Sequence, residues 1–473
     1  MKHTFLLFIL LILFTSSCKQ LKVPVTVDTQ PQPTTFSSSD GDTIPFQRMP
    51  WKKYYKDTLL IALIDEALIH NFDLLEVVQR IEIAKAGVKN AQGALLPQLS
   101  PSINGGMRRF GLYTMDGAGN ITTEITPGQI VPINLPDIFI GTQASWEVDI
   151  WGKLRNAKQA NLASVLAEQE VKNTITTNLV HDIAQAYFEL IALDIELKII
   201  QDFIKKQEEA LEVAKIKMES ARGNQLAVEQ FRAQLLNAQA LEYEYLQSIV
   251  ETENLINFLI GRYPQKIERS DEELFSQTPE IGGIGTPQQL LLNRPDIREA
   301  TMRVQINHYN RQSAKAAFYP NLDITAGFGY QAFDPSLLFL TPTSIAYTLL
   351  GGLTAPLLNR KALKAAFETA TAEQKASMIE YNRTLTYAVM EVNNVLSEIK
   401  NIDNIHRLKT EQELAAESAV AISMELFNTG KADYLDFIFA QQNALQVQIE
   451  LIEIKQRRWS SRAKLYKHLG GGW

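Results

Sequence analysis

Two long stretches of the chain carry apolar residues at spacings of three and four. The first stretch includes Leu162, Val165, Leu166, Val171, Ile175, Leu179, Ile183, Tyr187 and Leu190. Charged residues lie between these positions, so the pattern predicts amphipathic helices with one apolar face. Each stretch is free of proline and ends at an isolated glycine, Gly223 or Gly430. A glycine can take the left-handed backbone conformation that lets a helix turn back.

The predicted helices are far longer than those of ordinary globular domains. Gly152 and Gly223 lie 71 positions apart, and so do Asn359 and Gly430. At about 1.5 Å per residue, such a helix reaches roughly 105 Å. The segments of about half this length are 57–94, 224–260, 287–318 and 431–469. We therefore expect two long helices, each flanked by two half-length helices stacked end to end.

Extended segments follow Pro97 and Pro320, because the residue before a proline disfavours the helical conformation. Apolar and polar residues alternate most clearly over 321–330, which predicts a strand. Each half of the chain offers two strands of about ten residues or more, long enough to cross a membrane when tilted.

Four strands are too few for a closed barrel, since small membrane barrels need about eight. Unpaired strand edges are not tolerated in lipid. We therefore expect a homotrimer, in which three copies with four strands each close a twelve-stranded β-barrel.

These elements occur twice along the chain. Residues 73–99 align without gaps to 296–322. The residues that recur are Asp73, Glu76, Arg80, Ile83, Ala91, Ala94, Pro97 and Leu99. The sequence therefore predicts an internal duplication and an α+β membrane protein, in which each half supplies strands and long helices.

The N-terminus reads as an export signal. A basic start and the apolar run 5–14 precede small residues and Cys18, and about ten apolar residues are too few to span a membrane. The signal peptide is expected at 1–17, and Cys18 is the candidate lipidation site of a lipobox, in which Thr15 replaces the usual Leu. The alternative is an ordinary secretory signal with an incidental cysteine.

Composition narrows the function further. Forty-six basic and 53 acidic residues give a net charge of −7, which argues against nucleic-acid binding. Cys18 is the only cysteine, and the six histidines lack metal-ligand spacing. The sequence contains no nucleotide-binding, serine-hydrolase or zinc-protease motif, so we expect no enzyme activity, no metal and no cofactor. Trp146 and Trp151 either lie at a membrane interface or pack at a strand–helix junction.

Several segments resemble one family. They are the opening 51–73, the junction WEVDIWGKLRNA (146–157), the helical DIAQAYFELIALDIEL (182–197), LLLNRPDIREA (290–300) and the terminal HLGGGW. Together they resemble the TolC/OprM-like outer-membrane efflux proteins, in particular the lipoprotein branch that serves resistance–nodulation–division (RND) pumps. The resemblance runs from about Trp51 to Trp473.

The resemblance implies a trimeric, twelve-stranded β-barrel that is continuous with a long α-helical periplasmic barrel. Such a protein would be the exit duct of a tripartite pump in the outer membrane of a Gram-negative bacterium, lipid-anchored and extending into the periplasm. The implied partners are outer-membrane lipid, a periplasmic adaptor protein and an inner-membrane RND transporter. The expected organisation is a lipid-anchored tether (18–48), a first efflux repeat (49–264), a connector (265–286) and a second repeat (287–473). The exported substrate is left open.

Acidic residues follow both helix breaks, six positions after the glycine in each case: Glu229 and Asp436. In a trimer each would form a ring of three carboxylates, which favours cations and restricts passage. In the resembled family the position of Asp436 helps to form the periplasmic aperture, and Phe439 replaces a second aspartate. Alternatively, both acids only complement helix dipoles. Asp433 reads as a helix cap, and with Gly223 and Gly430 it is a candidate tip residue for adaptor contact.

Two rival functions remain at this point. A protein-secretion conduit of the type I kind would share the architecture. A periplasmic coiled-coil lipoprotein without a pore would share only the helices.

Overall fold

The computed structural model describes residues 31, 33–37, 49–270, 275, 283–355 and 360–473. The expected signal peptide and Cys18 lie outside these residues. The chain forms two compact units. We call them the sheet unit (85–164 and 303–379) and the helical unit (30–84, 165–302 and 380–473), and each is described by itself.

Helices dominate the described residues. They are α2 (Trp51–Tyr54), α3 (Thr58–His70), α4 (Phe72–Gly93), α5 (Met115–Thr122), α6 (Lys153–Glu219), α7 (Gln225–Ile260), α9 (Pro287–Asn293), α10 (Pro295–Ala316), α11 (Arg360–Asn428) and α12 (Tyr434–His468), with a short 3-10 helix η1 (Pro335–Leu337). The strands are β1 (Gln98–Arg108), β2 (Glu124–Thr126), β3 (Gln129–Ile130), β4 (Leu135–Val148), β5 (Asn321–Ala332) and β6 (Ile345–Thr354).

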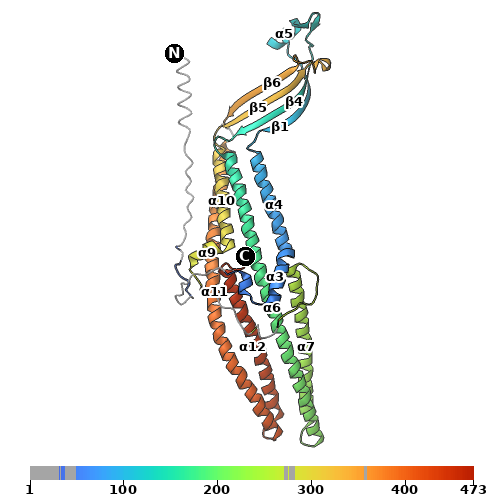
Figure 1. The fold of residues 1–473 in the computed structure, drawn as a ribbon, viewed down its shortest axis with the longest axis vertical. Helices are drawn as coiled ribbons and strands as arrows, with labels where there is room; N and C mark the ends of the chain where they lie inside the picture. The colour runs from blue at the N-terminus through green and yellow to red at the C-terminus, as the bar shows by residue number, and fades with distance from the viewer. Residues whose placement is uncertain (1–30, 32, 38–48, 271–274, 276–282, 356–359) are drawn as a thin grey trace. The chain divides into compact units, whose positions relative to one another are not determined.

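The sheet unit contains one four-stranded antiparallel sheet in the order β1–β4–β5–β6 (Figure 1). Its strands are 11, 14, 12 and 10 residues long, which confirms two long strands in each half of the chain. Gln98 pairs with Ser145, Ile138 with Ala332, and Asn321 with Thr354. Within the described residues, β1 and β6 are each paired on one side only.

Two tryptophans of the sheet unit pack where strands meet helices. The Trp146 indole donates a hydrogen bond to the Leu95 carbonyl (3.0 Å), and Trp151 donates to the Pro320 carbonyl (2.9 Å). Trp151 also stacks on Tyr319, with ring centroids 4.8 Å apart. Both side chains therefore take the junction role that the sequence left open.

The two long helices form as expected. Helix α6 has 67 residues and α11 has 69, and each is followed by a return helix of about half that length, α7 or α12 (Figure 1). In the part of the chain that the structure describes, no helix is both long and apolar enough to cross a membrane.

The half-length helices before the strands are each broken, where the sequence predicted continuous helices over 57–94 and 287–318. Asn71 separates α3 from α4: its Oδ1 accepts from Leu74 N (3.0 Å), and its Nδ2 donates to the Leu259 carbonyl (2.8 Å). Arg294 separates α9 from α10, because Pro295 follows it and disfavours a helical Arg294.

Two glycines of the helical unit allow the ends of the return helices to lie close to the breaks at Asn71 and Arg294. Gly261 ends α7 at φ +89°, and a Cβ there would lie 2.3 Å from the His70 carbonyl oxygen. Gly470 follows α12 at φ +92°, and a Cβ there would lie 2.5 Å from the Asn293 carbonyl oxygen. The end of each return helix thus lies against the end of α3 or α9, and a side chain larger than hydrogen would clash.

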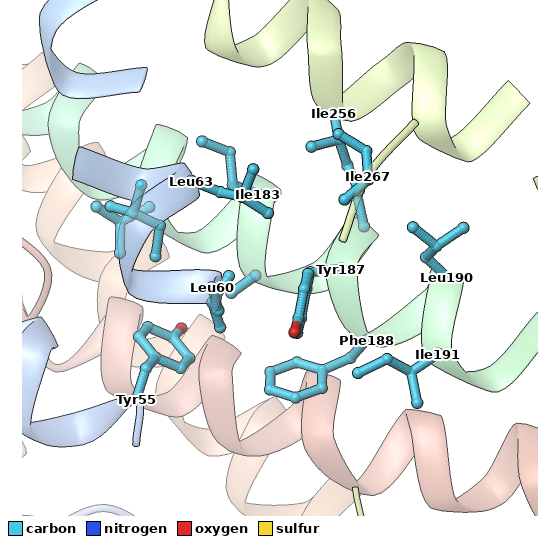
Figure 2. Close-up of a cluster of buried hydrophobic side chains, with 14 of the residues drawn as sticks. Tyr55, Leu60, Leu63, Ile183, Tyr187, Phe188, Leu190, Ile191, Ile256 and Ile267 are labelled. Atoms are coloured by element: carbon cyan, nitrogen blue, oxygen red, sulfur yellow. The ribbon is translucent and has the colours of Figure 1, made fainter. Parts of the chain in front are cut away.

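The largest core of the helical unit joins α3, α6 and α7. Leu60 and Leu63 point toward Ile183 and Tyr187, with Ile256 opposite them (Figure 2). A polar link runs through this core. The Tyr187 hydroxyl donates to Asp57 Oδ2 (2.8 Å), and Asp57 also caps α3 by accepting from Leu59 N (2.9 Å). Burial raises the pKa of Tyr187, so the hydroxyl remains a donor.

A residue near the N-terminus packs into the helical unit, which the sequence did not predict. The sequence predicted a tether over 18–48, but Phe36 within it is buried in the helical unit. A segment rich in Pro, Ser and Thr therefore contains a packed residue that its composition did not reveal.

Candidate functional site at the hairpin tips

The hairpin tips are the segments 217–231 and 426–439 of the helical unit, where each long helix ends and its return helix begins. At the second tip, Gly430 has φ +73°, and Lys431 N donates to the Leu426 carbonyl (2.9 Å). This is a Schellman arrangement, in which a left-handed residue ends the helix. The role expected of Gly430 is confirmed.

At the first tip, Ala221 takes the corresponding place instead of Gly223. Ala221 has φ +57°, Arg222 N donates to the Lys217 carbonyl (2.8 Å), and Gly223 does not have a left-handed φ. The prediction that Gly223 is the turning residue is therefore wrong. The hydrogen bond that closes the last turn of α6 selects the left-handed position, even though a side chain there costs about 1–2 kcal/mol.

The two tips give a matched pair of substitutions. Gly430→Ala should lower the free energy of unfolding by about 1 kcal/mol, because an alanine Cβ is strained at a positive φ. Ala221→Gly should be neutral or stabilising by less than about 1 kcal/mol, since relief of strain is partly offset by the flexibility of glycine. Denaturation followed by circular dichroism measures both. A neutral Gly430→Ala would contradict the assignment of the turning residue.

Asp433 and Asp436 together cap α12. Asp433 occupies the N-cap position, as expected, and its backbone N–H donates to Asp436 Oδ2 at 3.3 Å. Asp436 is thus the third residue of the helix and a partner in a capping box. Its side chain lies at the exposed start of α12, where the helix dipole favours a negative charge.

Glu229 is not the counterpart of Asp436. Asn224 caps α7 by accepting from Ala227 N (2.8 Å), so Glu229 is the fifth residue of its helix, not the third. Its carboxylate accepts from Gln225 Nε2 (2.8 Å) and lies 3.8 Å from the Arg232 guanidinium. Glu229 and Asp436 each lie six positions after a glycine, but Gly223 and Gly430 do not occupy equivalent positions in their turns, so the equal spacing does not make the two acids equivalent.

Phe439 lies one turn beyond Asp436 on the same helix and is 65% exposed. Residues three apart on a helix share a face, so an acid and an aromatic ring stand side by side at this tip. An exposed phenylalanine in this position is unpartnered within the described residues of one chain.

An aromatic cluster joins the two tips. Phe427 and Phe437 are parallel with centroids 5.9 Å apart, and the fully buried Phe231 of the first hairpin packs against both. Phe231 and Phe437 are buried and Phe427 is partly buried, and together they stabilise the contact by several kcal/mol. The sequence did not single out these residues, because helical phenylalanines at core spacing look alike.

Lys217 adds a polar bridge between the hairpins. Its Nζ lies 3.5 Å from the centroid of the Phe427 ring and donates to the Phe427 carbonyl (3.0 Å). The ammonium therefore sits at the carboxyl end of α11, where the helix dipole favours a cation. Burial lowers the pKa of Lys217.

A buried amide pair links the hairpins further from the tips. Gln207 on α6 donates from Nε2 to Gln441 Oε1 on α12 (2.9 Å), and Gln442 donates to Gln234 of α7 (2.6 Å). Polar pairs inside a helical interface fix its register, because any sliding leaves buried amides unpaired. The tips are thus held in one alignment.

The sheet unit presents two chemically different faces along its edge strands. Leu99, Ile103 and Met107 of β1 and Tyr347, Leu349 and Leu353 of β6 are between 69% and 82% exposed. Alternate residues on the same strands, Ser100, Asn104 and Thr348, line a cavity of about 640 Å³. An apolar face opposite a polar one is the pattern of a sheet between lipid and water.

The described residues contain no grouping of three or more His, Cys, Asp or Glu side chains that could hold a metal ion. Residues 63–262 and 286–471 match the family model described as outer membrane efflux protein. The chain belongs to this family. The model covers most of the chain in two segments, one in each half.

This family member has well-aligned relatives. The pyoverdine export outer membrane protein OpmQ of Pseudomonas putida is 27% identical over 439 residues, covering 92% of this chain and 90% of that protein. The cation efflux system protein CusC of Escherichia coli K12 is 24% identical, covering 93% and 94%. The solved structure of the outer-membrane channel OprN matches with a TM-score of 0.82 at 20% identity, covering 95% of this chain and 100% of that one.

Proposed function

We propose that three copies of this efflux protein close a twelve-stranded β-barrel and act as the passive exit duct of a tripartite pump. The observation that carries the proposal is the sheet of the sheet unit, apolar on one face and polar on the other, with β1 and β6 each paired on one side only within the described residues. Such edges are satisfied in lipid only by further strands. In a trimer, β1 of each chain would pair with β6 of the neighbouring chain, so that every edge strand gains a partner.

The proposal includes an internal duplication of the chain and a location in the outer membrane. The family model matches in two segments, and the caps Asn224 and Asp433 lie 209 positions apart, as do the left-handed Ala221 and Gly430. These spacings support an internal duplication with repeats at 49–264 and 287–473. Cys18 would carry the lipid in the outer membrane, and the helices would extend into the periplasm.

The partners follow from the channel role. A passive duct breaks no bond, so the energy for transport comes from an inner-membrane RND transporter held by a periplasmic adaptor. The tips, with Gly223, Gly430 and Asp433, are the surface offered to that adaptor. The relatives are named for different cargoes, pyoverdine in one case and cations in another. We therefore assign cargo selection to the transporter and not to this chain.

A cryo-EM reconstruction of the purified full chain tests the assembly. The proposal requires a three-fold particle with a closed sheet in which β1 of one chain pairs with β6 of the next. A globular monomer, or a trimer whose sheets stay open, would contradict it.

We assign the charge of the periplasmic aperture to Asp436, with Phe439 as its apolar neighbour and Glu229, on the first hairpin, as a second candidate acid. Asp436→Asn keeps an oxygen that accepts from Asp433 N but removes the charge. We expect higher conductance or weaker cation preference in planar bilayers, because a ring of carboxylates is lost. Asp433→Ala is the matched control: it removes a cap, about 1 kcal/mol of stability, and leaves the ring. If Asp436→Asn conducts like the parent, Asp436 is only a capping residue.

A further inference from the structure

Phe36 is buried far from its sequence neighbours. It is 2% exposed and packs in a cluster of the helical unit with Leu290 of α9, Ile297 of α10, Val392 of α11 and Leu469, which follows α12. Its neighbours on either side, Thr35 and Ser37, are exposed. Burial of one phenylalanine ring contributes about 1.5–3 kcal/mol, enough to hold a short segment in place.

Two hydrogen bonds flank the ring. Ser37 Oγ donates to Asn393 Oδ1 on α11 (2.9 Å), and Gln288 Nε2 on α9 donates to the Pro33 carbonyl (3.4 Å). The segment 33–37 therefore contacts two helices that are about a hundred residues apart in sequence, and both contacts are to the second half of the chain.

The two halves differ at this place. With the 223-residue offset that relates 73–99 to 296–322, α9 (7 residues) corresponds to the last turns of α3 (13 residues). In the first half, the extra turns of α3 supply Leu60 and Leu63, which are buried against α6. In the second half, residues 283–286 take their place without a helix, and Gly283 and Gly285 have left-handed φ values.

We infer that the second half has a docking site for the chain's own N-terminal segment, in which Phe36 replaces the apolar side chains of the missing helical turns. Residues 33–37 form a latch that covers the α9–α11–α12 cluster. Cys18 lies 18 positions before Phe36. At about 3.3–3.6 Å per residue, a lipid on Cys18 lies within roughly 65 Å of the latch. The position of the lipid depends on the proposed lipidation of Cys18, whereas the contacts of residues 33–37 do not.

Disulfide formation tests the latch directly. In the full chain, Ser37→Cys with Asn393→Cys places two thiols where side chains now touch, and Cys18 is the only other cysteine. We expect a disulfide between the two introduced thiols on mild oxidation, detected as a linked peptide by mass spectrometry. Adding Phe36→Ala should abolish most of it. Adding Thr35→Ala or Phe36→Leu should leave it.

Amide hydrogen exchange gives a second measurement on the same variants without added cysteines. Phe36→Ala should increase exchange at 385–396 and around Leu290, and Thr35→Ala should not. Equal cross-linking with and without Phe36, no cross-link in the parent pair, or unchanged exchange in Phe36→Ala would each overturn the latch. None of these measurements depends on conduction. They can therefore refute the latch without affecting the channel proposal, and a failure of the channel proposal would leave the latch untouched.

Discussion

Replacing Arg294 by alanine should lower the free energy of unfolding by about 3–5 kcal/mol. The guanidinium is 8% exposed and donates to Asp296 Oδ2 (2.7 Å), Glu391 Oε2 (2.8 Å) and the His468 carbonyl (3.3 Å). Its removal takes away the cation that both carboxylates share. Arg294 also holds the break between α9 and α10, so its loss loosens both helices at once. Thermal and chemical denaturation of the detergent-solubilised protein measure the effect.

Two further variants serve as comparisons for Arg294→Ala. Arg294→Lys should recover only part of the stability, because an ammonium cannot reproduce the forked hydrogen bonds to both carboxylates. Arg383→Ala removes an exposed pair with Glu380 on the same long helix as Glu391 and should cost less than about 0.5 kcal/mol. Similar losses for Arg294→Ala and Arg383→Ala would show that the buried network does not stabilise the fold.

Replacing Glu196 by glutamine should stabilise the protein, and only at neutral and alkaline pH. Glu196 is 5% exposed on α6, and burial, followed by the charges of Glu453 and Glu189, raises its pKa to about 8. The folded state therefore binds a proton that the unfolded state, with a pKa near 4.5, releases. Stability from this group is complete below about pH 4.5 and is lost as pH rises towards 8.

The size of the gain follows from the same shift. At about 1.36 kcal/mol per pKa unit, Glu196→Gln should gain roughly 3 kcal/mol at pH 7 and nothing at about pH 4.5. Burial, followed by the charges of Glu196, Glu453 and Glu244, raises the pKa of Tyr245 on α7 to about 12, so this hydroxyl stays neutral throughout. Glu229→Gln, at an exposed site, is the control and should change the free energy of unfolding by less than about 0.5 kcal/mol. A gain from Glu196→Gln that is equal at acidic and alkaline pH would contradict this explanation.

Periodicity was enough to predict the long elements. The 3.6-residue spacing through Leu179, Ile183 and Leu190 identified α6, and the alternation after Pro320 identified β5, because apolar residues recur along one face of each element. The breaks at Asn71 and Arg294 were not predicted. The break at Asn71 depends on a contact with the carbonyl of the distant Leu259, which local sequence does not reveal. The break at Arg294 has a local signal, Pro295, which the prediction of one helix over 287–318 did not use.

The site was predicted only in outline. Sequence reasoning found the second tip and the cap Asp433, since Gly430 and the acids have strong local preferences. It chose Gly223 over Ala221, because a left-handed residue is usually a glycine, whereas the hydrogen bonds that end α6 place the left-handed conformation at position 221. Lys217 and Phe36 escaped notice for a different reason: each acts through a tertiary contact, and nothing in its own neighbourhood in sequence marks it.

Planar-bilayer recording of the purified, folded trimer tests the central claim most directly, namely that three chains enclose one continuous water-filled path. We expect discrete current steps of uniform size from single trimers, with a preference for cations. A trimeric preparation that inserts into the bilayer but carries no current would contradict the channel and favour a coiled-coil lipoprotein without a pore.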